Sequence, residues 1–174
     1  MRKVIYFLPG VVLFVVASCT NDKPAKNYNQ LVDEGTSSFI KQGLEAGQTE
    51  IKASKVAETN SKNPRVISFA KMMIADHSEV GDELEKIAIN NRVRGEDSVS
   101  TAHQQNIADL ANLSGNKFDK AYMQMMVTDQ QDAVKLFTEA SKNQNEDILK
   151  FAKKTLPVLQ THLDSANVIS SSLK

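Results

Sequence analysis

The chain has 174 residues, and its 21 Lys and Arg residues balance its 21 Asp and Glu residues, so its formal charge is zero. Trp is absent and aromatic residues make up only 6% of the chain, so the composition lacks both the positive charge and the stacking side chains that are typical of nucleic-acid-binding proteins. We therefore expect no nucleic acid among its partners.

The first 19 residues have the pattern of a bacterial lipoprotein signal. Two basic residues precede an apolar run over residues 4–16, and small residues then lead to Cys19. A membrane-spanning helix needs about 20 apolar residues, whereas this run is shorter and contains Pro9 and Gly10, so a signal that is removed fits better. We therefore predict a signal peptide over residues 1–18 and lipidation, palmitate included, at Cys19.

The predicted lipid determines where the protein is expected. It would anchor the chain to a membrane of the cell envelope, facing the periplasm or the cell surface. Thr20 follows the lipidated residue, and the lack of an acidic residue there favours the outer membrane. Cys19 is the only cysteine, so we expect no disulfide within the mature chain. Removal of residues 1–18 takes away two basic residues and no acidic one, which leaves a formal charge of −2.

Residues 19–34 are predicted to be the lipidated cysteine and a flexible tether, because residues 20–30 are polar and rich in turn formers. Residues 35–174 are predicted to form one helical domain. Every long segment in that range spaces its apolar residues by three and four, which places them on one face of a helix.

The first two long helices of this domain are expected at about residues 36–60 and 64–90. The second starts where Asn63 can cap free amides and where Pro64 suits the first helical position. Its apolar seam repeats over three heptads and includes one histidine. The seam consists of Val66, Ala70, Met73, His77, Val80, Leu84 and Ile87.

A short helix is expected at about residues 101–113, with Gly115 as a left-handed stop. The third long helix, at about residues 118–142, has an apolar face that Asp129 interrupts.

The fourth long helix is expected to start near Asn145 and to contain Pro157 in its interior. Two helical hairpins joined by a long connection predict an all-α, ferritin-like four-helix bundle, with a short extra helix in the central crossover.

Short motifs are spread over these predicted helices. They are Phe69-Ala70-Lys71-Met72-Met73, Asp76-His77, Leu113-Ser114-Gly115, Phe118-Asp119, Met126-Val127, Asp129, Leu156-Pro157, Leu159 and His162-Leu163. Together they resemble the bacterial domain of unknown function 4142, over about residues 35–170. The resemblance implies an exported, ferritin-like bundle of unestablished activity. In that family the third-helix motif is usually Asp-His, whereas here Gln130 follows Asp129.

A metal site in the bundle core is the most specific chemical hypothesis that the sequence supports. Carboxylates and imidazoles that lie on four different helices can converge there, and Zn, Cu or Fe would suit such ligands. The candidate ligands are Glu50, His77, Asp129 and His162, with Asp76 next to them. A di-iron centre would need a Glu three residues before each His, but Ile74 and Leu159 occupy those positions.

Each of these residues also has a structural interpretation. His77 lies on an apolar seam, so a core imidazole bonded to Glu50 or Asp129 is the simpler expectation. His162 can be partly exposed, Asp76 can face solvent, and His103 is expected at the surface or in packing. Copper(I) ligation and core packing are the two interpretations of the methionines. These are Met72, Met73, Met123, Met125 and Met126.

The sequence therefore favours a lipid-anchored envelope protein that acts as a binding or structural helical module, without catalysis and without a cofactor. An envelope protein is the kind of partner that such a module would have. The alternative is a metal-binding protein or a weak metallo-oxidase with its site in the bundle core. The sequence gives no oligomeric state.

Overall fold

The structure is a computed structural model that describes Met1 and residues 33–94 and 99–173. Residues 2–32 lie outside the described residues, and they contain the predicted signal peptide after Met1, Cys19 and most of the predicted tether. Every described helix belongs to a compact unit that spans Leu31–Lys174. No helix in the part of the chain that the structure describes is long and apolar enough to cross a membrane.

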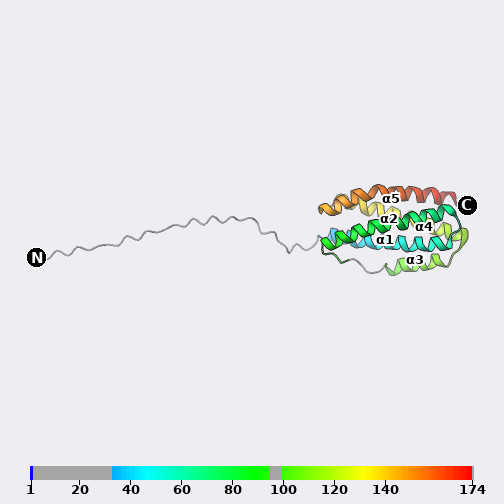
Figure 1. Cartoon of the computed structure of the whole chain (residues 1–174), viewed down its shortest axis with the longest axis horizontal. Helices are drawn as coiled ribbons and strands as arrows, with labels where there is room; N and C mark the ends of the chain where they lie inside the picture. The colour runs from blue at the N-terminus through cyan, green and yellow to red at the C-terminus, as the bar shows by residue number, and fades with distance from the viewer. Residues whose placement is uncertain (2–32, 95–98, 174) are drawn as a thin grey trace. The chain divides into compact units, whose positions relative to one another are not determined.

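The described residues form five helices and no strand, which confirms the predicted all-α class (Figure 1). In chain order they are α1 (Glu34–Asn60), α2 (Pro64–Asn90), α3 (Thr101–Ala111), α4 (Gly115–Ala140) and α5 (Glu146–Ser172).

Two predicted helix starts are confirmed by their caps. The Asn63 side chain accepts a hydrogen bond from the amide of Arg65, and Pro64 is the first residue of α2. Asn145 caps α5 in the same way. The predicted role of Gly115 was wrong. It has φ of 56°, as a left-handed residue should, but α3 ends at residue 111 and Gly115 begins α4.

The ends of α1 show how the two hairpins are aligned. At one end of the bundle, Thr36 Oγ1 donates to Asn143 Oδ1 in the turn after α4, at 3.3 Å. At the other end, Asn60 Nδ2 donates to the carbonyl oxygens of Ala111 and Leu113 just before α4, at 3.1 Å in each case. Helix α1 is therefore antiparallel to α4 as well as to α2.

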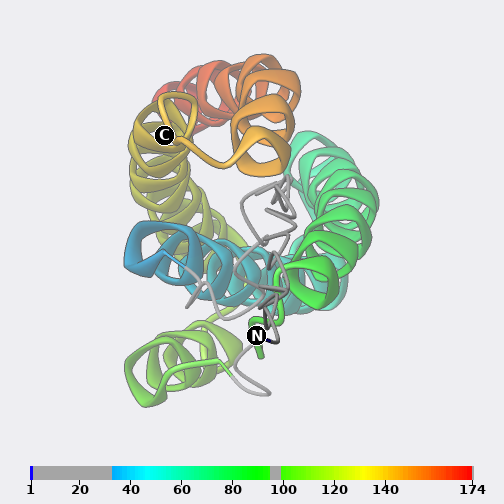
Figure 2. The same cartoon turned by 90° about the vertical axis from the view of Figure 1, so that its left-hand side faces the viewer.

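Helices α2 and α5 are joined in the same manner. Asn145 Nδ2 donates to Asn91 Oδ1 at 2.6 Å, and Arg65 donates to Ser172 at 2.7 Å. The order around the bundle is thus α2, α1, α4, α5, with α3 packed outside against α1 and α4 (Figure 2). Helices α2 and α4 point the same way, so the connection with α3 returns the chain along the bundle. This is the ferritin-like arrangement that the sequence predicted.

Two apolar clusters fill opposite halves of the bundle. One surrounds Phe118 and Tyr122, and the other surrounds Phe39, Phe137 and Phe151. The methionines support the packing interpretation, because they all lie in or against the first cluster. Met73, Met123 and Met126 are buried there, and Met72 and Met125 are partly buried.

Candidate functional site

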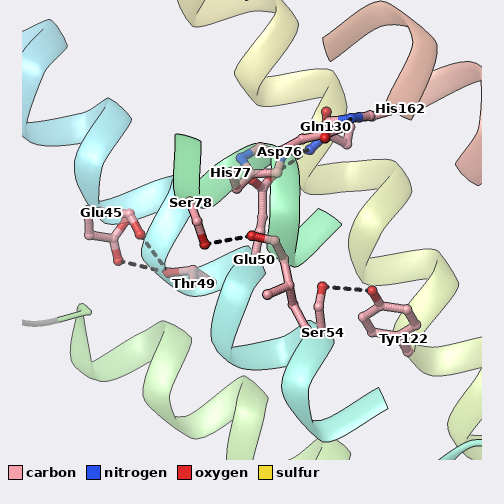
Figure 3. Close-up of polar contacts among 11 residues, drawn as sticks. Glu45, Thr49, Glu50, Ser54, Asp76, His77, Ser78, Tyr122, Gln130 and His162 are labelled. Carbon is pink, nitrogen blue, oxygen red and sulfur yellow. Dashed lines mark hydrogen bonds and ion pairs between the residues drawn. The ribbon is translucent and has the colours of Figure 1, made fainter. Parts of the chain in front are cut away.

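A polar layer separates the two apolar clusters near the middle of the bundle, and its side chains are among those drawn in Figure 3. Each of the four long helices contributes one buried side chain to it. These are Glu50 from α1, His77 from α2, Gln130 from α4 and His162 from α5, with exposed fractions of 1%, 4%, 0% and 1%. Burial of polar groups is unfavourable unless they find partners, so the contacts within this layer matter for both stability and function.

Glu50 is the centre of the first set of contacts. Its Oε2 atom lies 2.9 Å from His77 Nδ1. Gln130 Nε2 donates to Glu50 Oε1 at 2.8 Å and lies 3.2 Å from His77 Nε2. A carboxylate, an imidazole and an amide from three helices therefore form one connected group.

His162 forms the second set of contacts. Its Nε2 atom is 2.8 Å from Asp76 Oδ2, and Asp76 is itself 40% exposed. The imidazole rings of His162 and His77 lie 5.2 Å apart between centroids. His162 is thus a core residue and not a partly exposed one, and Asp76 bonds it from the rim of the layer.

The two histidines differ in charge because their surroundings differ. Burial lowers the pKa of His77, but the Glu50 carboxylate and, to a smaller extent, Asp76 outweigh burial and raise this pKa above its ordinary value. Burial dominates at His162 and lowers its pKa, although the hydrogen bond to Asp76 opposes the shift. The pairing of His77 with Glu50 is therefore an ion pair at a pH below the raised pKa, whereas His162 tends to stay neutral.

Three atoms of the layer are buried without a hydrogen bond: Glu50 Oε2, Gln130 Oε1 and His162 Nδ1. The polar contact of Glu50 Oε2 is its ion pair with His77 Nδ1, at 2.9 Å. Buried polar atoms usually have such partners, so this layer retains capacity to accept hydrogen bonds.

A cleft of about 180 Å³ between α1 and α2 leads to Glu50 and His77. Its walls are mostly apolar and come mainly from these two helices, with contributions from α4 and α5. Three glycines, Gly43, Gly47 and Gly81, line it. A Cβ atom at Gly47 would lie 3.8 Å from His77 Nδ1, so the lack of a side chain there leaves space next to this nitrogen.

Asp129 was predicted to face the bundle core, and this was wrong. The adjacent Gln130 faces the core, because a shift of one residue turns a side chain by about 100° around a helix. Asp129 lines a separate cleft of about 190 Å³ between α1, α3 and α4, together with Glu45 and His103. Burial, followed by the charge of Glu50, raises the pKa of Asp129 to about 7.

His103 helps to hold α3 in place beside this second cleft. Its Nδ1 atom lies 2.7 Å from Glu45 Oε1, and the amide of Ser100 donates to the same oxygen at 2.9 Å. Burial raises the pKa of Glu45, but these contacts outweigh it and leave that pKa below its ordinary value.

Of the four predicted metal ligands, Glu50, His77 and His162 lie in the polar layer and Asp129 lies outside it. Among the residues that the structure describes, no group of three or more His, Cys, Asp or Glu side chains is arranged to hold a metal ion. Gln130 was not among the predicted site residues. The family's Asp-His motif points to its position, since Gln130 stands where that motif has histidine.

Comparisons with known proteins give a family and a fold. The sequence pattern of the family described as a domain of unknown function, DUF4142, matches residues 21–169. No curated protein matches. A solved structure, a DUF305 fragment from Deinococcus radiodurans, superposes with a TM-score of 0.72 at 13% identity, covering 82% of this chain and 99% of that chain. That likeness concerns the fold alone. The family match spans most of the chain, so this protein belongs to the DUF4142 family.

Proposed function

We propose that this protein is a lipid-anchored domain of the cell envelope that binds a small ligand in the α1–α2 cleft and does not catalyse a reaction. The observation that carries the proposal is the floor of the cleft, where Glu50 Oε2 is buried without a hydrogen bond beside His77. A layer with only a structural role would be expected to satisfy such an atom. The layer's two close acid–imidazole contacts, Glu50–His77 and Asp76–His162, suit a preorganised binding site.

The anchoring part of the proposal rests on the sequence before the tether, and its test is the substitution Cys19→Ser. We expect the unsubstituted protein to sediment with the membrane fraction, and the outer membrane in particular. The variant should appear in the soluble envelope fraction, because its attachment through lipid is lost. Incorporation of labelled palmitate should disappear with it. Equal membrane association of both proteins would reject anchoring at this residue.

A metal-binding function is the second candidate. The observation in its favour is that two potential ligand atoms, Glu50 Oε2 and His162 Nδ1, are buried without a hydrogen bond. If it is correct, the melting temperature should rise with one particular ion among Zn²⁺, Cu²⁺ and Fe²⁺ and fall with chelator. The variant His77→Ala should lose this response. We expect the same melting temperature with every ion, because no group of three or more His, Cys, Asp or Glu side chains among the described residues is arranged to hold one.

A further inference from the structure

We propose that the α1–α2 cleft takes a small organic cation, a primary ammonium group on a compact apolar body, and this inference rests on the function proposed above. The ammonium group donates to Glu50 Oε2 at the floor, and the apolar body fills the space between the two helices.

The charge of the lining favours a cation. Glu50 lies at the floor of the cleft, and the exposed residues Asp82 and Glu85 belong to its α2 side. No Lys or Arg is among the described residues that line it, and His77 is the single basic group. An ionised carboxylate accepts up to about four hydrogen bonds, so Glu50 can receive an ammonium group while it keeps its contacts with Gln130 and His77. An anion would instead meet three carboxylates.

Two of the glycines leave space in the cleft next to its buried floor. A Cβ atom at Gly81 would meet nothing within 4 Å, and one at Gly47 would make only an ordinary contact with His77. Gly43 has a different role, because its Cβ would come within 2.8 Å of Leu84 Cδ2. Gly43 thus allows the two helices to approach each other, whereas Gly47 and Gly81 leave room between them.

The walls and the volume limit the body of the ligand. The larger apolar side chains among the wall residues are Leu44, Ile51, Val80, Leu84, Phe137 and Leu159. The cleft measures about 180 Å³. An engineered apolar cavity of about 150 Å³ in another protein holds benzene, so a body of roughly six to eight heavy atoms fits here. A primary ammonium group on such a body matches the floor and the walls together.

The test uses the full-length lipoprotein in a neutral detergent, titrated by calorimetry with three probes of similar shape: benzylamine, benzyl alcohol and benzoate. Two variants change the cleft. Glu50→Gln removes the charge at the floor while keeping the side-chain shape. Gly47→Ala narrows the space next to His77, and the helix should tolerate it because alanine has a higher helix propensity than glycine. Glu58→Gln removes an equal charge from an exposed site two turns further along α1 and serves as the matched control.

We expect benzylamine to bind at least tenfold more tightly than benzyl alcohol and benzoate not to bind. Glu50→Gln should weaken benzylamine binding at least tenfold, and Gly47→Ala should weaken it without loss of thermal stability. Glu58→Gln should bind like the unsubstituted protein.

Equal binding of benzyl alcohol and benzylamine, with both weakened by Gly47→Ala, would overturn the cation inference and leave the cleft as a ligand site. If none of the probes binds, or if binding is the same in Gly47→Ala as in the unsubstituted protein, the function proposed for the cleft is wrong as well.

Discussion

Replacement of His77 by alanine should lower the free energy of unfolding by about 3–5 kcal/mol at pH 7, which is the usual cost of removing one partner of a buried ion pair. The reason is the carboxylate that stays behind. Glu50 is 1% exposed, and in the variant its remaining side-chain partner in the layer is Gln130. A domain of this size is stable by about 5–15 kcal/mol, so the loss is large, and urea denaturation followed by circular dichroism would measure it.

Two comparisons separate this cause from a general packing defect. The double variant Glu50→Gln, His77→Ala should be more stable than His77→Ala alone, because the buried charge is gone. His103→Ala removes an imidazole that is 36% exposed and pairs with Glu45, so we expect a loss of about 1 kcal/mol or less. A double variant that is less stable than the single one would show that the charge of Glu50 is not the cause.

The contribution of this ion pair should also depend on pH in a definite direction. The pKa of His77 is raised on folding, against the opposing effect of burial, because the Glu50 carboxylate favours the imidazolium. A raised histidine pKa stabilises the fold fully below the ordinary value of 6.5, and the contribution is lost as the pH rises through the raised pKa. The stability difference between the unsubstituted protein and His77→Ala should therefore be larger at pH 7 than at pH 10.

Asp129→Asn should make the protein more stable at pH 8, by about 2 kcal/mol. Burial and the nearby charge of Glu50 raise the pKa of Asp129 from 3.8 to about 7, so its ionisation at pH 8 opposes folding. A shift of that size corresponds to roughly 4 kcal/mol, and the partial exposure of this side chain reduces the expected effect by about half. Asparagine has nearly the same shape and stays neutral.

The pH dependence of this gain identifies its source. An acid whose pKa is raised on folding favours the folded state fully below its ordinary value of 3.8, and this contribution is lost as the pH rises through about 7. The advantage of Asp129→Asn should thus vanish at pH 4 and be complete at pH 8. Asp132→Asn, at an exposed carboxyl on the same helix, should change the stability by less than about 0.5 kcal/mol. A gain that is equal at pH 4 and pH 8 would contradict ionisation as its cause.

The bundle itself was predictable from the sequence because its signals are local. The spacing of apolar residues places a stripe on each helix, and caps such as Asn63 and Asn145 act on amides only two or three residues away. The order of two hairpins and a long connection then leaves few ways to bury four stripes. The pairing of His77 with a carboxylate could also be predicted, since a buried imidazole on an apolar seam needs a partner.

The contacts within the candidate site depend on distances between residues far apart in the chain, and only the tertiary structure decides these distances. Periodicity predicts the direction of a side chain to within about one residue, and an error of that size put Asp129 in the core in place of Gln130. The role of Gly47 and Gly81 in the cleft could not be predicted from the sequence, because the space that they leave lies between α1 and α2 and depends on how these helices face each other. The sequence by itself thus determined the helices and their inward faces. Only the tertiary structure shows that Glu50 is the partner of His77 and that a cleft lies beside them. Both depend on how the helices pack, and a contact across the bundle leaves no local pattern in the sequence.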